Sequence, residues 1–379
     1  MRILMLAPHP TVQGPLPKHT PLLVGALREL GCQVVTEVWG RHSDHETLGE
    51  KVTGRLRDIG RVRATLSRQP FDVMVVKTSH EWWTLGRDIP LLFATRPLCR
   101  HIVVQFHGGR SDLLAGRGHT AFKIASQMLM RASDGALTLS TDEQRHLQQF
   151  YPQGRFYRVS NPFLAPDRVR PVADVRSFGL KPGVPTLLFV GRLMREKGIF
   201  DTLDALAMLK HRIAYQLLVV GDGSETDAVR ERIRALGLEH TVVLTGYLGR
   251  DAVADAYSTA DCFVLPTYWF EGFPTVIAEA MHAGLPIVTT RTRGIADHLD
   301  DELNALFVPP RDTVALAAAL ERVLADHSLR ASMGRANREK VSELSPAVVG
   351  RHYLQTLRKI VGHGESAMVR NAPRQSVGR

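Results

Sequence analysis

Short apolar strands alternate with helical segments along the whole chain, and this alternation constrains the fold more than any other feature. Strands without polar alternation are typical of parallel sheets that helices cover on both faces. The pattern therefore predicts an α/β protein. The strand candidates are residues 2–7, 33–38, 72–76, 102–106, 135–139 and 156–159 in the first half, and residues 186–190, 216–220, 242–244, 262–265, 287–290 and 306–308 in the second.

A proline-rich stretch separates the two sets of strands. Residues 161–185 contain five prolines, which interrupt any regular pattern. A chain of 379 residues can bury two cores of ordinary domain size. We therefore predict two Rossmann-like domains, 1–165 and 166–345, whose parallel sheets face each other across a cleft. We also predict a helix over 346–362 that packs back on the first domain, and a flexible tail over 363–379.

The first domain is basic. Residues 1–165 carry 21 Lys and Arg against 13 Asp and Glu, in a chain of net charge +10. A basic excess attracts polyanions, but the chain has no finger, zipper or aromatic-interleaved basic strand that reads nucleic acid, so anionic lipid fits better. Residues 51–68 have apolar residues at helical spacing, arginines around them and only Asp58 opposing. Two interpretations stay open: a sheet-covering helix with a solvated basic face, and a face that rests on an anionic membrane.

The expected compartment follows from what the sequence lacks. No run of about 18 apolar residues occurs, so we expect no bilayer span. The first strand candidate begins at Arg2 without a leader, and the three cysteines are widely spaced in apolar surroundings. We expect a cytoplasmic protein with buried thiols and no metal site, whose only membrane contact is peripheral, on the cytoplasmic face.

Two glutamates and two basic residues of the second half indicate the chemistry of a site. Glu271 and Glu279 lie eight positions apart across the start of a helix near Pro274. The amides and dipole at a helix start attract an anion. Arg192 and Lys197, just after the first strand of this half, suit a diphosphate. Carboxylates beside phosphates need hydroxyl donors, which a ribose and a hexose supply, so the combination predicts a nucleotide-sugar ligand.

Glu279 carries a further expectation. It stands among apolar helix residues, where an unpaired buried carboxylate would cost several kcal/mol. We therefore expect a buried partner for it, and a sugar hydroxyl qualifies.

Other nucleotide-binding fingerprints are missing or weak. The first strand is followed by a proline-rich segment without a G-x-G-x-x-G pattern, and no G-x-x-x-x-G-K-[ST] pattern occurs anywhere. These absences disfavour a dinucleotide site in the first half and a P-loop. The G-x-G run that begins at Gly221 is equally consistent with a strand-to-helix turn and with a ligand-binding loop.

Three runs of the second half resemble a known family. They are Gly191-Arg192-Leu193 with Lys197-Gly198, then residues 257–266, then Glu271-Gly272-Phe273-Pro274 with Glu279-Ala280-Met281 and residues 284–288. In this order they closely resemble the retaining glycosyltransferases of family 4, also described as glycosyl transferases group 1, which have the GT-B fold. The resemblance covers most of residues 185–325, and the motifs are specific as a set.

The resemblance implies a role for each matching residue. It implies that Arg192 and Lys197 hold the donor diphosphate, that Glu271 meets the donor sugar and that Glu279 holds the ribose. His107, in a run Phe-His-Gly-Gly, matches the family's histidine loop near the anomeric carbon of the donor; a structural loop histidine is the alternative. The candidate catalytic residues are thus His107, Arg192, Lys197 and Glu271. The donor-binding candidates are Gly14, Gly191, Arg192, Lys197, Gly221, Gly272, Phe273, Pro274, Thr275 and Glu279.

The chain departs from the family's pattern at two places. Family members often carry a Gly-Gly loop after the first strand, whereas this chain has only Gly14 among prolines. Arg293-Gly294-Ile295-Ala296-Asp297 stands where the family more often has Gly-Gly-Ile-Pro-Glu. The first departure weakens the assignment of Gly14, and the second alters the floor of the pocket.

Together these features predict an enzyme of the glycosyltransferase class. The expected reaction moves a sugar, with retention, from a nucleotide-sugar to a hydroxyl of a glycan or lipid-linked acceptor in cell-envelope polysaccharide or glycolipid synthesis. Arginine and lysine would replace a divalent metal, and no cofactor besides the donor is expected. Two alternatives remain: a GT-B nucleotide-sugar epimerase, and a non-catalytic nucleotide-sugar-binding subunit of an assembly complex.

Overall fold

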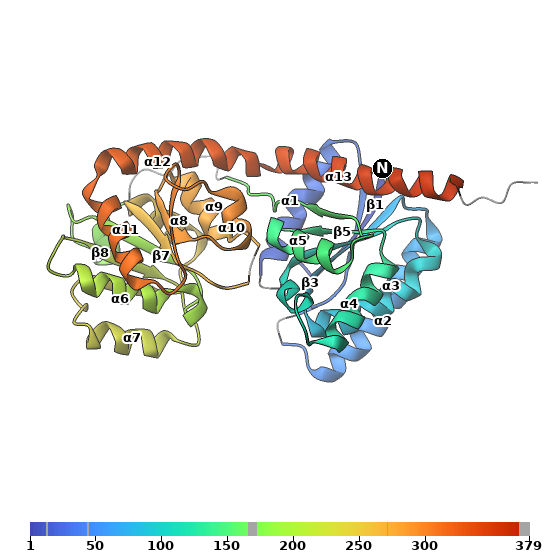
Figure 1. The fold of residues 1–379 in the computed structure, drawn as a ribbon, viewed down its shortest axis with the longest axis horizontal. Helices are drawn as coiled ribbons and strands as arrows, with labels where there is room; N and C mark the ends of the chain where they lie inside the picture. Colours follow the sequence, from blue (N-terminus) through green and yellow to red (C-terminus); the bar gives the residue numbers. More distant parts are fainter. Residues whose placement is uncertain (13, 44, 166–172, 271, 371–379) are drawn as a thin grey trace, which may run out of the picture. The chain divides into compact units, whose positions relative to one another are not determined.

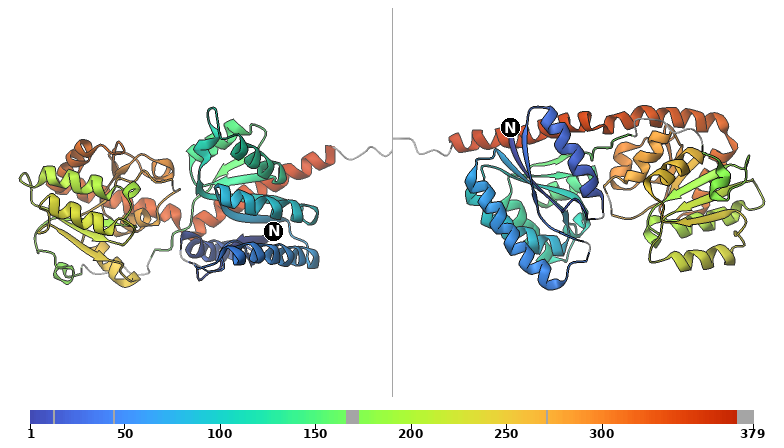
Figure 2. Two further views of the ribbon diagram at one scale, coloured as in Figure 1. Left: turned by 90° about the horizontal axis from the view of Figure 1, so that it is seen from below. Right: turned by 180° about the vertical axis from the view of Figure 1, so that it is seen from behind.

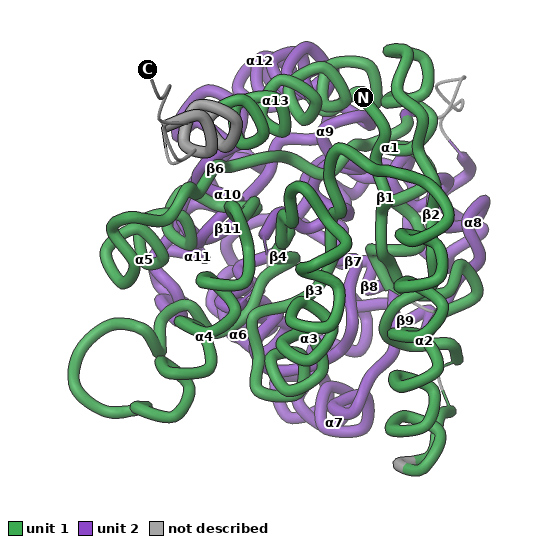
Figure 3. The backbone as a smooth tube through the Cα atoms, turned by 90° about the vertical axis from the view of Figure 1, so that its right-hand side faces the viewer, with its two compact units in different colours: residues 1–164, 344–379 green, residues 165–343 purple. Residues whose placement is uncertain are grey.

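The chain forms two compact units. The computed structural model describes residues 1–370 apart from 13, 44, 166–172 and 271, without the side chains of residue 48 and residues 363–370. Unit 1 comprises Met1–Leu164 and the chain from Leu344 onward, and unit 2 comprises Ala165–Glu343 (Figure 3). The units thus divide at 164/165 and 343/344, one or two residues from the boundaries predicted at 165/166 and 345/346.

Unit 1 is built on a six-stranded parallel sheet in the order β2-β1-β3-β4-β5-β6. Its strands are β1 (Arg2–Ala7), β2 (Gln33–Val38), β3 (Val73–His80), β4 (Ile102–Gly109), β5 (Gly135–Thr138) and β6 (Phe156–Arg158). β3 and β4 run further than the sequence predicts. Because Thr78 pairs with Phe106 and His80 with Gly109, the polar residues after the apolar runs stay in the sheet. Lys77 and His107 are therefore strand residues.

Helices cover both faces of this sheet (Figures 1 and 2). Alternate strand residues such as Met74 and Val76 pack against α2 to α5, while Val73 and Val75 pack against α1 and α13. This division is the two-residue period of a strand covered on both sides. The helical segments are α1 (Pro15–Glu29), α2 (Leu48–Arg68), α3 (Trp82–Thr95), η1 (Arg96–Leu98), η2 (Ser111–Leu114), α4 (Thr120–Ala132), α5 (Thr141–Phe150) and α13 (Pro346–Arg370).

The C-terminal helix α13 belongs to unit 1, as Figure 3 shows by its colour. Tyr353 of this helix is fully buried, and its hydroxyl donates a 2.8 Å hydrogen bond to Oε1 of Gln105 on β4. The helix continues to Arg370, so the prediction of a flexible tail from residue 363 is wrong for residues 363–370. Glu, Ala and Met favour a helix there, and the next proline is Pro373. The rest of the predicted tail, 371–379, lies outside the described residues.

Unit 2 repeats the architecture with a second six-stranded parallel sheet, in the order β12-β11-β10-β7-β8-β9. Its strands are β7 (Thr186–Val190), β8 (Gln216–Val220), β9 (Val242–Gly246), β10 (Cys262–Leu265), β11 (Ile287–Thr290) and β12 (Ala305–Val308). Its helical segments are η3 (Val175–Phe178), η4 (Arg195–Lys197), α6 (Ile199–Leu209), α7 (Thr226–Ala235), α8 (Arg250–Thr259), α9 (Thr275–Ala283), α10 (Arg293–His298), α11 (Thr313–Ala325), α12 (His327–Lys340) and η5 (Val341–Leu344), which ends one residue into unit 1. The prediction of an α/β protein with two Rossmann-like sheets is confirmed.

Each sheet has one point where the strand order reverses. In unit 1 the chain proceeds outward in both directions from the neighbours β1 and β3, and in unit 2 from the neighbours β7 and β10. In open α/β sheets, ligands bind outside the carboxyl ends of the two strands at this switch point. The segments that follow β1, β3, β7 and β10 are therefore the places to search for a site.

The basic helix α2 differs from its predicted arrangement. A sheet-covering helix, one of the two interpretations left open, would turn Val52 and Leu56 toward the sheet, but they are 63% and 67% exposed, whereas Val62 and Leu66 are buried. A helix of 21 residues is about 32 Å long and a strand of six residues only about 20 Å, so the first turns of α2 extend past the sheet.

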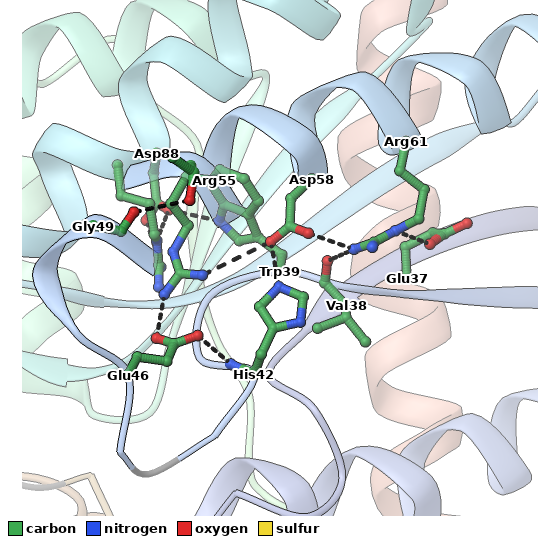
Figure 4. Close-up of polar contacts among 12 residues, drawn as sticks. Glu37, Val38, Trp39, His42, Glu46, Gly49, Arg55, Asp58, Arg61 and Asp88 are labelled. Carbon is green, nitrogen blue, oxygen red and sulfur yellow. Dashed lines mark hydrogen bonds and ion pairs between the residues drawn. The ribbon is translucent and has the colours of Figure 1, made fainter. Parts of the chain in front are cut away.

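The sequence predicts a solvated basic face on α2, but two of its arginines form ion pairs with acidic residues (Figure 4). Arg55 pairs with Glu46 at 2.9 Å, and Arg61 pairs with Glu37 at 2.9 Å and with Asp58 at 2.8 Å. His42 contacts the other oxygen of buried Asp58. Asp58 is therefore not the only opposing charge, because Glu37 and Glu46 come from preceding segments. Within the described residues, no helix is both long and apolar enough to cross a membrane.

Candidate functional site

The segment after β7 presents two cationic side chains at the switch point of unit 2. Gly191 continues from the strand, Arg192 is exposed, and Lys197 ends the short helix η4 half-buried. Among the described residues Arg192 has no ion-pair partner. Gly198 then turns the chain into α6 with φ 80°, a conformation that favours glycine. A Cβ at Gly198 would also lie 2.5 Å from the carbonyl oxygen of Pro266, in the segment after β10.

The segment after β10 is bonded to this cationic segment. The amide of Tyr268 donates to the carbonyl oxygen of Glu196 at 2.9 Å, and the hydroxyl of Thr267 donates to the same oxygen at 3.1 Å. Thr267 is fully buried, and its hydroxyl also accepts from the amide of Trp269. The backbone around Lys197 is therefore fixed beside the chain that leads to Glu271.

The start of α9 follows directly. The helix begins at Thr275, with Pro274 as its N-cap at φ −63°; the side chain of Pro274 cannot cap it, and its first turn has no acidic residue. Gly272 and Pro274 are buried, and the ring of Phe273 lies 4.5 Å from the ring of His298 on α10. The positive end of a helix without acidic residues in its first turn attracts an anion. The predicted helix start near Pro274 is found.

Glu279 lies on α9 and is half-buried, and the buried partner expected for it is found in the protein itself. It hydrogen-bonds to the buried hydroxyl of Tyr257 on α8, which itself donates to the carbonyl oxygen of Val276 at 3.0 Å. Burial, followed by the charge of Glu279 and this hydrogen bond, raises the pKa of Tyr257 well above its usual value. Because a protein group contacts Glu279, burial alone does not require a sugar hydroxyl there. Glu271, the other member of the pair, lies outside the described residues.

Gly221 has a packing role at the end of β8. Its φ is 138°, and a Cβ there would lie 2.0 Å from the carbonyl oxygen of Gly191. Gly223 similarly faces the carbonyl oxygen of Leu193 at 2.3 Å. These two glycines let the end of β8 approach the cationic segment, which explains the G-x-G run; contact of Gly221 with a ligand remains a prediction.

Two of the predicted site residues belong to unit 1. Gly14, with φ 141°, is the N-cap of α1, and a Cβ there would lie 3.7 Å from a guanidinium nitrogen of Arg41. His107 lies near the carboxyl end of β4, and both of its ring nitrogens are buried without a hydrogen-bond partner among the described residues. The other described candidates, which include Gly272 and Thr275, gather at the carboxyl edge of unit 2.

The sequence reasoning missed two polar residues beside His107. Lys77 on β3 and His19 on α1 are both buried. The charge of Lys77 contributes to lowering the pKa of both His19 and His107, so the three groups lie near one another. The available signal was a single lysine inside the apolar run VMVV-K.

Metal ligands are not gathered in the described part of the chain: no group of three His, Cys, Asp or Glu residues is arranged to hold an ion there. The three cysteines are free thiols.

The fold and this site define a class. Two doubly wound units in tandem, with a cationic segment and a helix start at the switch point of the second, form the GT-B fold of glycosyltransferases. Solved structures agree. A sucrose-phosphate synthase from Thermosynechococcus elongatus aligns with a TM-score of 0.76 at 20% identity, over 96% of this chain and 99% of that one. The Anabaena protein HepE, crystallised with UDP-glucose, aligns with a TM-score of 0.68 at 18% identity, over 95% and 100%.

The sequence comparisons agree with the fold. Residues 173–340, which lie in unit 2, match the family model described as glycosyl transferases group 1. The α-D-kanosaminyltransferase of Streptomyces kanamyceticus is 30% identical over 251 residues, which cover 61% of this chain and 63% of that protein. The matched segments span only 40% to 63% of the first three curated relatives.

Proposed function

We propose that this protein transfers a glycosyl group from a nucleotide-diphosphate-sugar to a hydroxyl of a glycan or lipid-linked acceptor. The observation that carries the proposal is the geometry at the β7/β10 switch point. There the segment of Arg192 and Lys197 is hydrogen-bonded to the segment that leads into the start of α9. Two cations and a helix start suit a diphosphate, and the neighbouring carboxylates suit the hydroxyls of the ribose and sugar.

In this mechanism the leaving group is stabilised by the protein's own cations. Arg192 and Lys197 offset the charge that grows on the nucleoside diphosphate as the glycosidic bond breaks, which is where preorganised charge lowers a barrier most. Glu271 orients the sugar and stabilises its oxocarbenium-like charge, while Glu279 fixes the ribose. His107 of unit 1 is assigned to the anomeric carbon of the donor only through the family resemblance. The reaction proceeds with retention and without a divalent metal, as in glycosyltransferases of family 4.

Similar proteins support the choice of donor and pathway class. HepE was crystallised with UDP and with UDP-glucose, and a 31% identical relative in Salmonella typhimurium is described as a putative colanic acid biosynthesis glycosyltransferase. We therefore place the reaction in the synthesis of cell-envelope polysaccharide or glycolipid. No cofactor other than the donor takes part.

Purified protein and a panel of nucleotide-sugars test the proposal. We expect one donor to raise the thermal midpoint, since a ligand at about a hundred times its Kd adds about 2.7 kcal/mol of stability. That donor should then support transfer in the presence of EDTA to a glycan or lipid-linked acceptor, with the product's anomeric configuration, read by NMR, equal to the donor's. Epimerisation of the donor alone, or binding without turnover on any acceptor, would replace this function with one of the two alternatives.

We also propose that unit 1 rests on an anionic membrane on the cytoplasmic side. Val52 and Leu56 form an exposed apolar pair one helical turn apart on α2, beside exposed Lys51 and Arg57. Trp83 on the adjacent helix α3 is 84% exposed. Apolar side chains among lysines and arginines are typical of interfacial helices.

Sedimentation with vesicles tests this contact. The Leu56→Ser, Trp83→Ser double variant should bind phosphatidylglycerol vesicles at least about tenfold more weakly than the wild type, because each side chain contributes more than about 1.4 kcal/mol when buried. Tyr247→Ser in unit 2, where Tyr247 is 85% exposed, is the matched control and should change nothing. Equal binding to phosphatidylcholine vesicles, or an unaffected double variant, would contradict the proposal.

A further inference from the structure

Lys77 is the most unusual charged residue of unit 1. It lies on β3, in the middle of the sheet and opposite Gln105 of β4, and only 1% of its surface is exposed. Its Nζ has no hydrogen-bond partner among the described residues. An ammonium group carries three donors, and leaving them unpaired in a buried place is costly. Burial lowers the pKa of Lys77 to about 7.

The groups around Lys77 do not compensate its charge. His107 follows Gln105 by two positions and so points to the same face of the sheet as Lys77 and Gln105. His19 comes from α1 on that face, and its Nδ1 lies 2.9 Å from the carbonyl oxygen of Pro162, to which it donates. Burial and the charge of Lys77 lower the pKa of His19 to about 4 and that of His107 well below its usual value. Two neutral imidazoles and one lysine thus share the place, and no carboxylate contributes to any of these three pKa shifts.

The opposite face of the same strand shows how this unit pairs its structural polar groups. Thr78 donates to Asp88, which also accepts from Nε1 of Trp39 at 2.8 Å and from Nε of Arg87 at 2.7 Å. Figure 4 shows Trp39 and Asp88 beside the equally well-paired Asp58 network. The half-buried cation Arg87 on that side therefore has a counter-ion, whereas buried Lys77 has no hydrogen-bond partner among the described residues. The difference marks the α1 face as the one that receives a ligand.

The position of these residues agrees with a ligand site. β3 flanks the switch point of the first sheet, as β7 and β10 flank that of the second. We propose that Lys77 and His107 bind an anionic oxygen group, a phosphate or a carboxylate, of the acceptor substrate. This assignment rests on the proposed function, because the donor diphosphate already has Arg192 and Lys197 in unit 2. Lys77 supplies the charge and neutral His107 supplies an N–H donor, while the N–H of neutral His19 already donates to Pro162.

The experiment separates this site from the donor site. The full chain is first saturated with UDP, so that Arg192 and Lys197 are occupied, and inorganic phosphate or acetate is then added at pH 6.5 while the thermal midpoint is measured. We expect at least one of the two anions to raise the midpoint of the wild type. Lys77→Met should weaken the response to that anion at least tenfold and leave the response to UDP unchanged. It should also raise the midpoint of the ligand-free protein, since it removes an unpaired buried amine.

Matched variants complete the test. Lys181→Met changes an exposed lysine and should keep both responses. Arg192→Ala should lose the UDP response and keep the anion response, so failure of the donor assignment and failure of the Lys77 site give different results. If Lys77→Met does not fold, His107→Gln must show the same selective loss. The inference is overturned if neither anion acts on the wild type, if Lys77→Met responds like the wild type, or if it loses UDP binding instead.

Discussion

The two sheets of this protein place cations at corresponding points but in opposite environments. At the β7/β10 switch point of unit 2, Arg192 is exposed on a loop and Lys197 is half-buried. At the β1/β3 switch point of unit 1, Lys77 lies within a strand and is almost completely buried. An exposed cation keeps its charge at neutral pH, whereas burial lowers the pKa of Lys77 to about 7, so that a bound anion would favour its charged form. Unit 2 therefore presents charged side chains to an anionic ligand at neutral pH. In unit 1, the protonation of Lys77 is coupled to ligand binding.

The comparison breaks most clearly if the predicted donor-site residues of unit 2 are dispensable. We expect Lys197→Ala and Glu271→Ala each to lower kcat/KM for glycosyl transfer at least about a hundredfold, or about 2.7 kcal/mol, the effect of losing one preorganised group of the transition state. Steady-state kinetics with the donor identified in the panel measures this. Lys181→Ala, in the same unit but away from the switch point, should retain wild-type rates. Near-normal turnover in either site variant would remove the assignment of the donor site.

The buried cation of unit 1 predicts a dependence of stability on pH. The pKa of Lys77 is about 7 in the folded protein and 10.5 for an ordinary solvated lysine, so the unfolded chain binds more protons between these values. The free energy of unfolding should therefore rise with pH across this window, at up to about 1.4 kcal/mol per pH unit from this group. His19 acts in the same direction at lower pH, since its folded pKa is about 4.

Chemical denaturation between pH 7 and 9.5 measures this effect. Other groups titrate as well, so the quantity to compare is the difference in slope between the wild type and Lys77→Met. The variant should lose the rise, and Lys181→Met should keep it. Equal slopes in the wild type and Lys77→Met would show that Lys77 is charged in the folded protein, and the contrast between the two sheets would disappear.

The parts of the fold that depend on local sequence could be predicted. Strands such as β7 and β11 have the predicted bounds, because a short apolar run between turn residues defines a buried parallel strand by itself. The ends of β3 and β4 could not be predicted, because Lys77 and His107 stay in the sheet only through pairing between distant segments. Likewise, Arg55 and Arg61 gave no local sign of their partners on other segments.

The same distinction applies to the candidate site. The donor residues of unit 2 lie in three short runs that carry a family's motifs, so their order along the chain was informative. The cluster of unit 1 unites α1, β3 and β4 through single residues, and only the three-dimensional structure brings His19, Lys77 and His107 together. Glu279 was placed on the correct helix, but its contact with Tyr257 depends on the packing of α8 against α9.

Arg293, at the edge of unit 2, destabilises the fold through its backbone conformation, whereas Lys77 in unit 1 does so through the burial of an amine. It begins α10 with φ 40°, where a side chain is strained, and its guanidinium lies 4.8 Å from the ring centre of Phe270, next to Glu271. Strain of this kind costs roughly 1 kcal/mol, and a cation–π contact returns about 0.5–1 kcal/mol. Arg293→Gly removes both the strain and the cation–π contact, so we expect it to change the free energy of unfolding by less than about 1 kcal/mol. Arg293→Ala removes the contact but keeps the strain, so it should be less stable than Arg293→Gly by about 1 kcal/mol. This order reverses the usual helix preference for alanine.

Urea denaturation measures this order. The control is the same pair of substitutions at Arg250, the exposed first residue of α8, where alanine should be at least as stable as glycine. If alanine were the more stable residue at both positions, the backbone of Arg293 would not be strained. Of the two destabilising features, only the buried amine of Lys77 would then remain.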